Sequence, residues 1–255
     1  MTLADLIVAT NEYTPFIGVF HSTNNSAFAN IISCRELRSR IDRNGVVFVF
    51  YGKPSYTLKN GGAVINEVSF AFGQESILNY VRAIPFDSGG LASGKYSKFF
   101  STESYEDKLD ETISYFSIPS GRFDIGRFIA TFFGTNENYI MGRFCAWSAE
   151  MKGQSLLTSW AALVNASSEL NHFDPPATTI EITINSPIKI SKSNVNRVIL
   201  PFGYLDRPEV LDFIKNTGIK FDTYEDEVLV DKSTLWNALN EIARGIKFEE
   251  AGEVE

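Results

Sequence analysis

The 255-residue chain has few of the residues that build metal centres or disulfide frameworks. It contains two cysteines, Cys34 and Cys145, and two histidines, His21 and His172. Two thiols in a chain of this length are more typical of small core residues in a reducing compartment than of a disulfide scaffold. The histidines are distant in sequence from any cysteine or acidic cluster, so we expect neither a zinc site nor a structural metal.

Long apolar runs and an excess of positive charge are also missing. No stretch approaches the roughly 20 apolar residues of a membrane-spanning helix, and the N-terminal sequence MTLADLIVATNEYTPF lacks the pattern of a secretion signal. We therefore expect a cytoplasmic protein without membrane contact. The formal net charge of -8 disfavours a non-specific nucleic-acid binder. A Rossmann dehydrogenase is disfavoured because no G-x-G-x-x-G lies between a strand and a helix.

The spacing of apolar residues predicts a mixed order of strands and helices. Strands are predicted over 16–21, 46–51, 63–72, 178–190, 196–201 and 219–224, and helices over 26–40, 104–117, 125–133, 156–164, 207–218 and 233–246. The segment IPFDSGGLASGKYSKFF, residues 84–100, is rich in glycine and serine, which favours a functional loop over a regular element. We predict an α+β fold in a single domain, 1–255, with 205–255 as a C-terminal α/β extension.

The stretch TTIEITINSPIKI, residues 178–190, carries a carboxylate inside an alternating strand. Because side chains alternate across a strand, Ile180, Ile182 and Ile184 are expected in the core, and Glu181 on the opposite face. That face is either open solvent, which makes Glu181 an ordinary sheet residue, or part of a ligand site.

Two other groups of polar or aromatic residues stand at the ends of apolar strands: His21 with Thr23, and Tyr51 to Tyr56. In this order, together with Glu181, they resemble the ADP-ribosyltransferases, specifically the DarT-like toxins that modify nucleic acid. The resemblance is carried by HSTNNSAFANII with its H-x-T start, by VVFVFYGKPSY with a basic residue and proline after a strand, and by IEITINSPIKI. It covers residues 17–57 and 178–201.

The resemblance implies an ADP-ribosyltransferase-like split β-sheet core with surrounding helices, and NAD as co-substrate. Glu181 would be the catalytic residue. It would hold the nicotinamide-ribose hydroxyl, stabilise the oxocarbenium-like transition state and help to deprotonate the acceptor. One carboxylate is enough for this chemistry because nicotinamide carries a positive charge and leaves neutral, whereas most glycosidases need two.

The resemblance also assigns residues to NAD. The implied cofactor-binding residues are His21, Ser22, Thr23, Tyr51, Lys53 and Tyr56. His21 and Thr23 would hydrogen-bond the adenosine side, the two tyrosines would pack on the nicotinamide ring, and Lys53 would pair with the pyrophosphate. Each has a plainer interpretation, as a core aromatic, a satisfied strand-end histidine or a solvated turn lysine.

The segment 84–100 is the candidate acceptor-recognition element. The candidate substrate-binding residues there are Asp87, Ser88, Lys95, Tyr96 and Lys98. Lysines interleaved with aromatic residues can neutralise phosphates and stack bases, although ordinary packing of a surface loop explains the same composition.

The leading interpretation is an NAD-dependent mono-ADP-ribosyltransferase acting on a nucleic acid or a protein, of toxin or anti-phage defence type, with a cognate antitoxin or defence partner. One alternative is an NAD glycohydrolase, in which water replaces the acceptor. The other is a non-catalytic protein that retains the fold to bind a nucleotide or a partner chain. It stays open because Lys53 stands where the family has arginine and Ala27 where it has asparagine; lysine lacks the planar fork of arginine.

Overall fold

The computed structural model describes residues 2–8, 10–39, 45–54, 67–78, 80–100, 105–121, 123–147, 149–168, 175–225 and 232–247. These residues form a mixed α+β structure with mostly antiparallel strands, which confirms the predicted class. The chain divides into two compact units. Unit 1 comprises Met1–Pro15 and Val81–Ile182, and unit 2 comprises Phe16–Tyr80 and Thr183–Glu255. The extension expected from residue 205 lies inside unit 2.

Unit 2 is built on a sheet whose strands run in the order β3 (Val47–Tyr51), β1 (Val19–Thr23), β4 (Val68–Phe72), β8 (Val195–Pro201) and β9 (Lys220–Tyr224). Strand β1 is antiparallel to both of its neighbours, β4 is antiparallel to β8, and β9 is parallel to β8. A second, small ladder joins β2 (Glu36–Leu37) and β7 (Ile188–Lys189). Strand β1 covers Val19–Thr23, so the strand predicted over 16–21 begins and ends later than expected.

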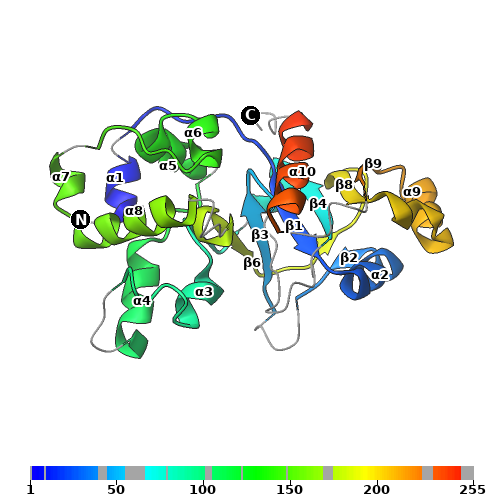
Figure 1. The fold of residues 1–255 in the computed structure, drawn as a ribbon, viewed down its shortest axis with the longest axis horizontal. Helices are drawn as coiled ribbons and strands as arrows, with labels where there is room; N and C mark the ends of the chain where they lie inside the picture. Colours follow the sequence, from blue (N-terminus) through cyan, green and yellow to red (C-terminus); the bar gives the residue numbers. More distant parts are fainter. Residues whose placement is uncertain are drawn as a thin grey trace. The chain divides into compact units, whose positions relative to one another are not determined.

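Helices cover both faces of this sheet (Figure 1). On one face, α10 (Lys232–Gly245) contributes to a core cluster of Leu235, Leu239 and Ala243 with Phe20, Ala71 and Ile199. On the other face, Phe28 of α2 (Asn25–Cys34) packs on Phe70, with ring centroids 5.8 Å apart. Phe70 and Ala71 are consecutive in β4, so their side chains point to opposite faces, and the two helices sandwich the sheet.

Helix α2 starts and ends through local backbone chemistry. The Asn24 side chain accepts a hydrogen bond from the Ala27 amide and caps the first turn. Arg35 adopts a left-handed conformation, φ 53 and ψ 37, and its carbonyl accepts the Ile190 amide at 2.9 Å. The chain then enters β2. The prediction that this helix continues to residue 40 was wrong, because a left-handed residue ends the helical hydrogen-bond ladder.

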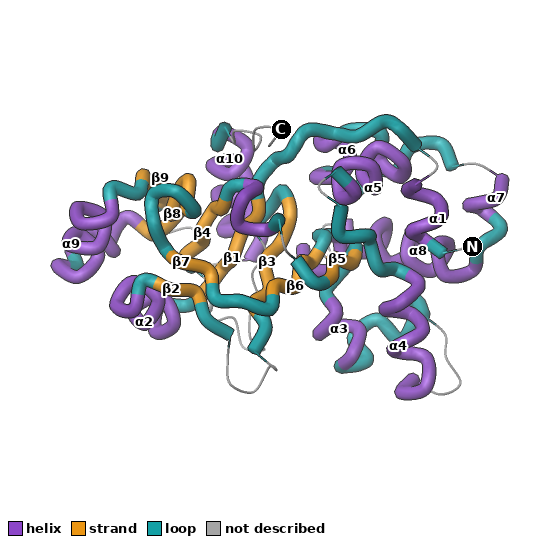
Figure 2. The backbone as a smooth tube through the Cα atoms, turned by 180° about the vertical axis from the view of Figure 1, so that it is seen from behind, coloured by secondary structure: helices purple, strands orange, loops and turns teal. Residues whose placement is uncertain are grey.

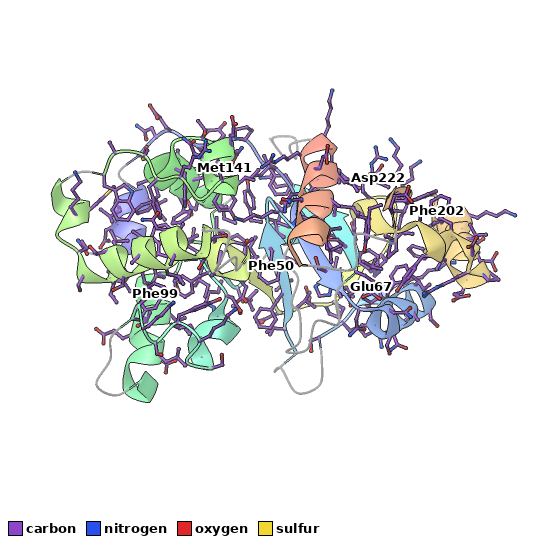
Figure 3. All side chains as sticks on the ribbon, viewed as in Figure 1. Phe50, Glu67, Phe99, Met141, Phe202 and Asp222 are labelled. Atoms are coloured by element: carbon purple, nitrogen blue, oxygen red, sulfur yellow. The ribbon has the colours of Figure 1, made fainter. Side chains whose placement is uncertain are left out.

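Glu67, just before β4 and labelled in Figure 3, joins several segments of unit 2. Its carboxylate accepts the Tyr204 hydroxyl at 2.6 Å and the Asn25 amide at 3.1 Å, and its carbonyl accepts the Tyr224 hydroxyl at 2.5 Å. Arg207 donates to the Asn25 side chain and lies 3.5 Å from the centroid of the Tyr204 ring. A carboxylate at the start of α2 also satisfies amides that have no partner within the helix.

The remaining elements of unit 2 are the 3-10 helices η1 (Gln74–Ile77) and η4 (Phe202–Asp206) and the helix α9 (Pro208–Thr217). Helix α9 has proline in its first turn and ends at Gly218, which is left-handed with φ 63. This pairing of proline at the start and glycine after the end was the basis for predicting the helix.

Unit 1 is mainly helical, as the purple segments of Figure 2 show. Its helices are α1 (Leu3–Val8), α3 (Ser88–Ala92), α4 (Tyr105–Tyr115), α5 (Asp124–Phe133), α6 (Asn136–Ile140), α7 (Ala149–Lys152), α8 (Ser155–Ser168) and η3 (Pro175–Thr178). Strand β5 (Arg82–Ile84) neighbours β6 (Glu181–Ile184), which starts in this unit. Trp160 of α8 is packed by Phe128, Phe132 and Phe133 of α5. No helix in the described ranges has the length and apolar character needed to cross a membrane.

The segment 84–100 is not simply a loop, and the expectation that it contains no regular element was wrong. Residues 88–92 form α3, with the Leu91 amide donating to the Asp87 carbonyl at 3.1 Å. Gly90 is required there, because a Cβ atom at this position would lie 2.7 Å from the ring of the buried Tyr96. The glycines of this segment were interpreted as a sign of a flexible loop. Gly90 instead leaves space for the ring of Tyr96.

The N-terminal segment crosses α5 at Gly126. The Thr14 amide and hydroxyl donate to the Gly126 carbonyl at 3.2 and 3.4 Å. A Cβ atom on Gly126 would lie 2.5 Å from the Thr14 carbonyl oxygen, which is far inside van der Waals contact. The absence of a side chain on Gly126 therefore allows this close crossing.

We expect Gly126→Ala to lower the free energy of unfolding of unit 1 by about 1 to 3 kcal/mol, the usual cost of inserting a methyl group into a packed contact. Chemical denaturation followed by tryptophan fluorescence measures the change. Gly245→Ala is the matched control, since Gly245 ends α10 with no atom within 4 Å of its Cβ position. Equal stability of the two variants would contradict the steric role assigned to Gly126.

Candidate functional site

Glu181 is buried at the start of β6, with 4% of its surface exposed. All four residues of this strand are buried, so both faces of β6 are covered. The alternative of an exposed sheet glutamate is therefore wrong. Within the described part of the chain, the Glu181 carboxylate takes its side-chain hydrogen bond from the hydroxyl of Ser88, the first residue of α3, which is 8% exposed.

Burial raises the pKa of Glu181 to about 7, because the charged carboxylate loses its hydration. The Ser88 hydroxyl opposes this effect by donating to the carboxylate. Asp87 raises the pKa further through charge repulsion, whereas Arg82 of β5 and the Ser88 backbone lower it. Asp87, Ser88 and Glu181 thus act on one another within unit 1, although 93 positions separate the last two in sequence.

Arg82 was missed by the sequence reasoning. It lies in a short apolar stretch, and neither its spacing nor its neighbours in sequence signalled a role. The Nε atom of Arg82 is buried, and no hydrogen-bond acceptor reaches it among the described residues. Its positive charge favours the ionised form of Glu181. The group around Glu181 therefore consists of two carboxyls, one hydroxyl and one guanidinium.

The other three candidate substrate-binding residues follow α3. Tyr96 is buried against Gly90, so its ring is part of the packing of unit 1. Lys95 and Lys98 are exposed, with their ammonium groups 5.3 and 4.7 Å from the ring centroids of Tyr96 and Phe99. Phe99 is labelled in Figure 3. Such cation-π contacts favour a particular orientation of each lysine by about 0.5–1 kcal/mol.

His21 lies in β1 of unit 2 and is half-buried. Its Nδ1 atom is 2.9 Å from the Phe48 carbonyl oxygen, and because a carbonyl can only accept, Nδ1 carries the proton. Burial lowers the pKa of His21, and the bond to Phe48 opposes this partly. The neutral imidazole therefore keeps Nε2 as a hydrogen-bond acceptor.

Ser22 and Thr23 complete the H-x-T motif, but the three residues do not share a face. Side chains alternate along β1, so Ser22 points to the face covered by α10, where its hydroxyl donates to Ser69 at 3.3 Å. His21 and Thr23 share the opposite face. Of the motif, only these two residues point the same way.

Tyr51 and Lys53 are both buried in unit 2. The Tyr51 ring meets the Phe16 ring edge-on, with centroids 5.6 Å apart. Lys53 is 1% exposed and follows Gly52, which has φ 74 and donates its amide to the Gly18 carbonyl. Desolvation lowers the pKa of Lys53 to about 7, with a smaller contribution from the charge of Arg244. Tyr56 lies outside the described residues.

The candidate residues therefore form two groups, each within one unit. Asp87, Ser88 and Glu181 are brought together in unit 1, and His21 and Thr23 in unit 2. Among the described residues, no three His, Cys, Asp or Glu side chains are grouped to hold a metal ion.

Comparison with known proteins adds no relative: no protein-family model, curated protein or solved structure matches the chain.

Stability should depend on pH through Glu181. The pKa of this carboxyl is about 7 in the folded chain and about 4.5 when unfolded, so the folded state binds the proton more tightly. The stabilisation by this proton is complete below pH 4.5 and is lost as the pH rises through 7, by about 3 kcal/mol. Glu181→Gln removes the titrating group. Urea denaturation between pH 5 and 8 should show a smaller decline in the variant than in the wild type; equal slopes would contradict the assignment.

Lys53 should act in the opposite direction. Its pKa falls from 10.5 to about 7 on folding, so the unfolded state binds the proton more tightly and stability rises between pH 7 and 10.5. Lys53→Met, which keeps a similar volume without charge, should stabilise the chain by up to about 5 kcal/mol at pH 7 and by progressively less toward pH 10. Melting temperatures over this range provide the measurement. A gain that is independent of pH would show that the charge of Lys53 is not the cause.

Proposed function

We propose that the protein is an NAD-dependent ADP-ribosyltransferase with Glu181 as the catalytic residue and an ADP-ribosyltransferase-like sheet as its core. The environment of Glu181 carries this proposal. A carboxyl that is 4% exposed, hydrogen-bonded to a serine and shifted to a pKa of about 7 is not the solvated side chain of an ordinary strand. Perturbed acids of this kind are concentrated at functional sites.

In this proposal Glu181 binds the ribose end of NAD. Ser88 occupies one carboxylate oxygen, Oε1, and a carboxylate has capacity for further hydrogen bonds. The carboxylate, which also accepts from the Ser88 backbone, would use this remaining capacity to accept a ribose hydroxyl. When bound, NAD supplies a ribose whose bond to nicotinamide breaks readily, because nicotinamide leaves as a neutral molecule.

Burial makes the charge of Glu181 effective in this reaction. In its ionised form, the carboxylate stabilises the positive charge that develops on the ribose, and the low local dielectric strengthens that interaction. A pKa near 7 also suits a general base that removes a proton from the acceptor at neutral pH. One residue can therefore supply both effects.

The resemblance assigns the adenosine side of NAD to His21 and Thr23. Their common face on β1 and the neutral state of His21 support this assignment. The position of Ser22 does not support a role in binding the same part of NAD, because its side chain points to the opposite face, which α10 covers. Lys53 would pair with the pyrophosphate only in its charged form, which its lowered pKa makes incomplete at neutral pH.

A second candidate, NAD glycohydrolase, is favoured by one observation. Asp87 acts on Glu181 through its charge, so the group contains a second carboxyl. Nicotinamide needs no acid to leave, so a second carboxyl would serve to activate the attacking water while Glu181 stabilises the sugar. The two candidates differ in whether ADP-ribose is transferred to a macromolecule or released.

The test measures nicotinamide release from NAD and transfer of labelled ADP-ribose to components of a cell extract. We expect Glu181→Gln to lower both by about 100-fold or more, the loss typical when one group that stabilises transition-state charge is removed. Glu137→Gln changes an exposed carboxylate of α6 in the same unit and should leave both rates unchanged.

The outcomes separate the candidates. Label transferred only in the presence of extract supports the transferase, and sensitivity of that label to nuclease or protease identifies the acceptor class. Nicotinamide release without any labelled macromolecule supports the glycohydrolase. Turnover that survives in the Glu181→Gln variant excludes the catalytic role, and NAD binding without turnover in the wild type supports a binding protein.

A further inference from the structure

The Ser88 side chain is placed to act on Glu181 and not on solvent. It is 8% exposed and donates its hydroxyl hydrogen to Glu181 Oε1. A serine hydroxyl has one hydrogen, so this bond uses its full donor capacity. The hydrogen bond fixes one carboxylate oxygen and thereby restricts the orientation of the whole group.

Asp87 occupies the N-cap position of α3, directly before Ser88. Its carbonyl accepts the Leu91 amide of α3, so its backbone is held by the helix. Its side chain does not cap the helix. The Oδ1 atom of Asp87 lies 3.2 Å from the Cβ position of Gly89, so the side chain lies along the first turn, next to Ser88.

We propose that Asp87 and Ser88 form a positioning pair that acts on Glu181 in opposite directions. Ser88 holds the carboxylate in place and favours its charge, and Asp87 opposes that charge from the preceding position. The pair orients the carboxylate and adjusts an ionisation that burial of Glu181 has already shifted. Asp87 and Ser88 then act on Glu181 and not on the acceptor, and their part in catalysis rests on the function proposed above.

Among the described residues, the charged groups that act on the Glu181 carboxyl are Asp87, before α3, and Arg82, on β5. The charges of Asp87 and Arg82 have opposite effects on the proton of Glu181. Removing one member of the positioning pair should therefore move the titration in a direction that identifies that member.

The test follows the titration of the Glu181 carboxyl by NMR in protein labelled with ¹³C-glutamate, the Glu181→Gln variant identifying the signal. We expect Asp87→Asn to move the midpoint to lower pH by about one pH unit, and Ser88→Ala to move it to higher pH by a similar amount. Ser88→Thr keeps a hydroxyl and should restore the wild-type midpoint. Ser93→Ala is the matched control, because Ser93 bonds only the Gly90 carbonyl at the other end of α3.

The pH profile of nicotinamide release should move with the titration in each variant. We expect kcat to change at a given pH while KM for NAD changes little, since the pair acts through Glu181. A merely structural role would lower the rate at every pH and leave the midpoint unchanged.

Shifts of Asp87→Asn and Ser88→Ala in the same direction, or an unmoved midpoint in either, would overturn the inference. A wild-type protein that releases no nicotinamide would instead refute the proposed function, while the titration would still decide whether the pair controls Glu181. The two failures are thus distinguishable.

Discussion

A carboxyl group on a strand that is covered on both faces must either remain neutral or be given a donor and a compensating charge. Glu181 of unit 1 is in this situation. Ser88 supplies the donor and Arg82 the compensating charge. Ser88 is the first residue of α3 (88–92), and Gly90 in the same helix accommodates the ring of Tyr96. A short glycine-containing turn thus supports an acid that is far away in sequence.

The strands and longer helices could be predicted because their signals are local. Short apolar, β-rich runs identified β3 and β8 within one residue of their ends, and helical spacing identified α5. The errors arose where a single backbone conformation or a distant contact decided the outcome. Arg35 ends α2 by adopting a left-handed conformation. The helical spacing of the apolar residues does not predict this conformation. Helix α3 was missed because its glycines were read as loop residues.

The candidate site shows the same division between local and distant information. Alternation placed Glu181 on the face opposite the isoleucines, but whether that face was covered depended on elements far along the chain. The partnership with Ser88 spans 93 positions and has no local signature. By contrast, the alternation of side chains along a strand predicts that Ser22 points to the face opposite His21 and Thr23. This was missed because the strand was expected to end at residue 21, whereas β1 continues to Thr23.

Glu67 has a consequence for the motions of unit 2. Its carboxylate and carbonyl bind the start of α2, the hydroxyl of Tyr204 and the end of β9, so these three segments share one anchoring residue. Segments that share an anchor open together and exchange their amide hydrogens with solvent in the same event, instead of fraying independently at their ends. We therefore expect the first turn of α2 and the last residues of β9, nearly 200 positions apart, to open in one event of local unfolding.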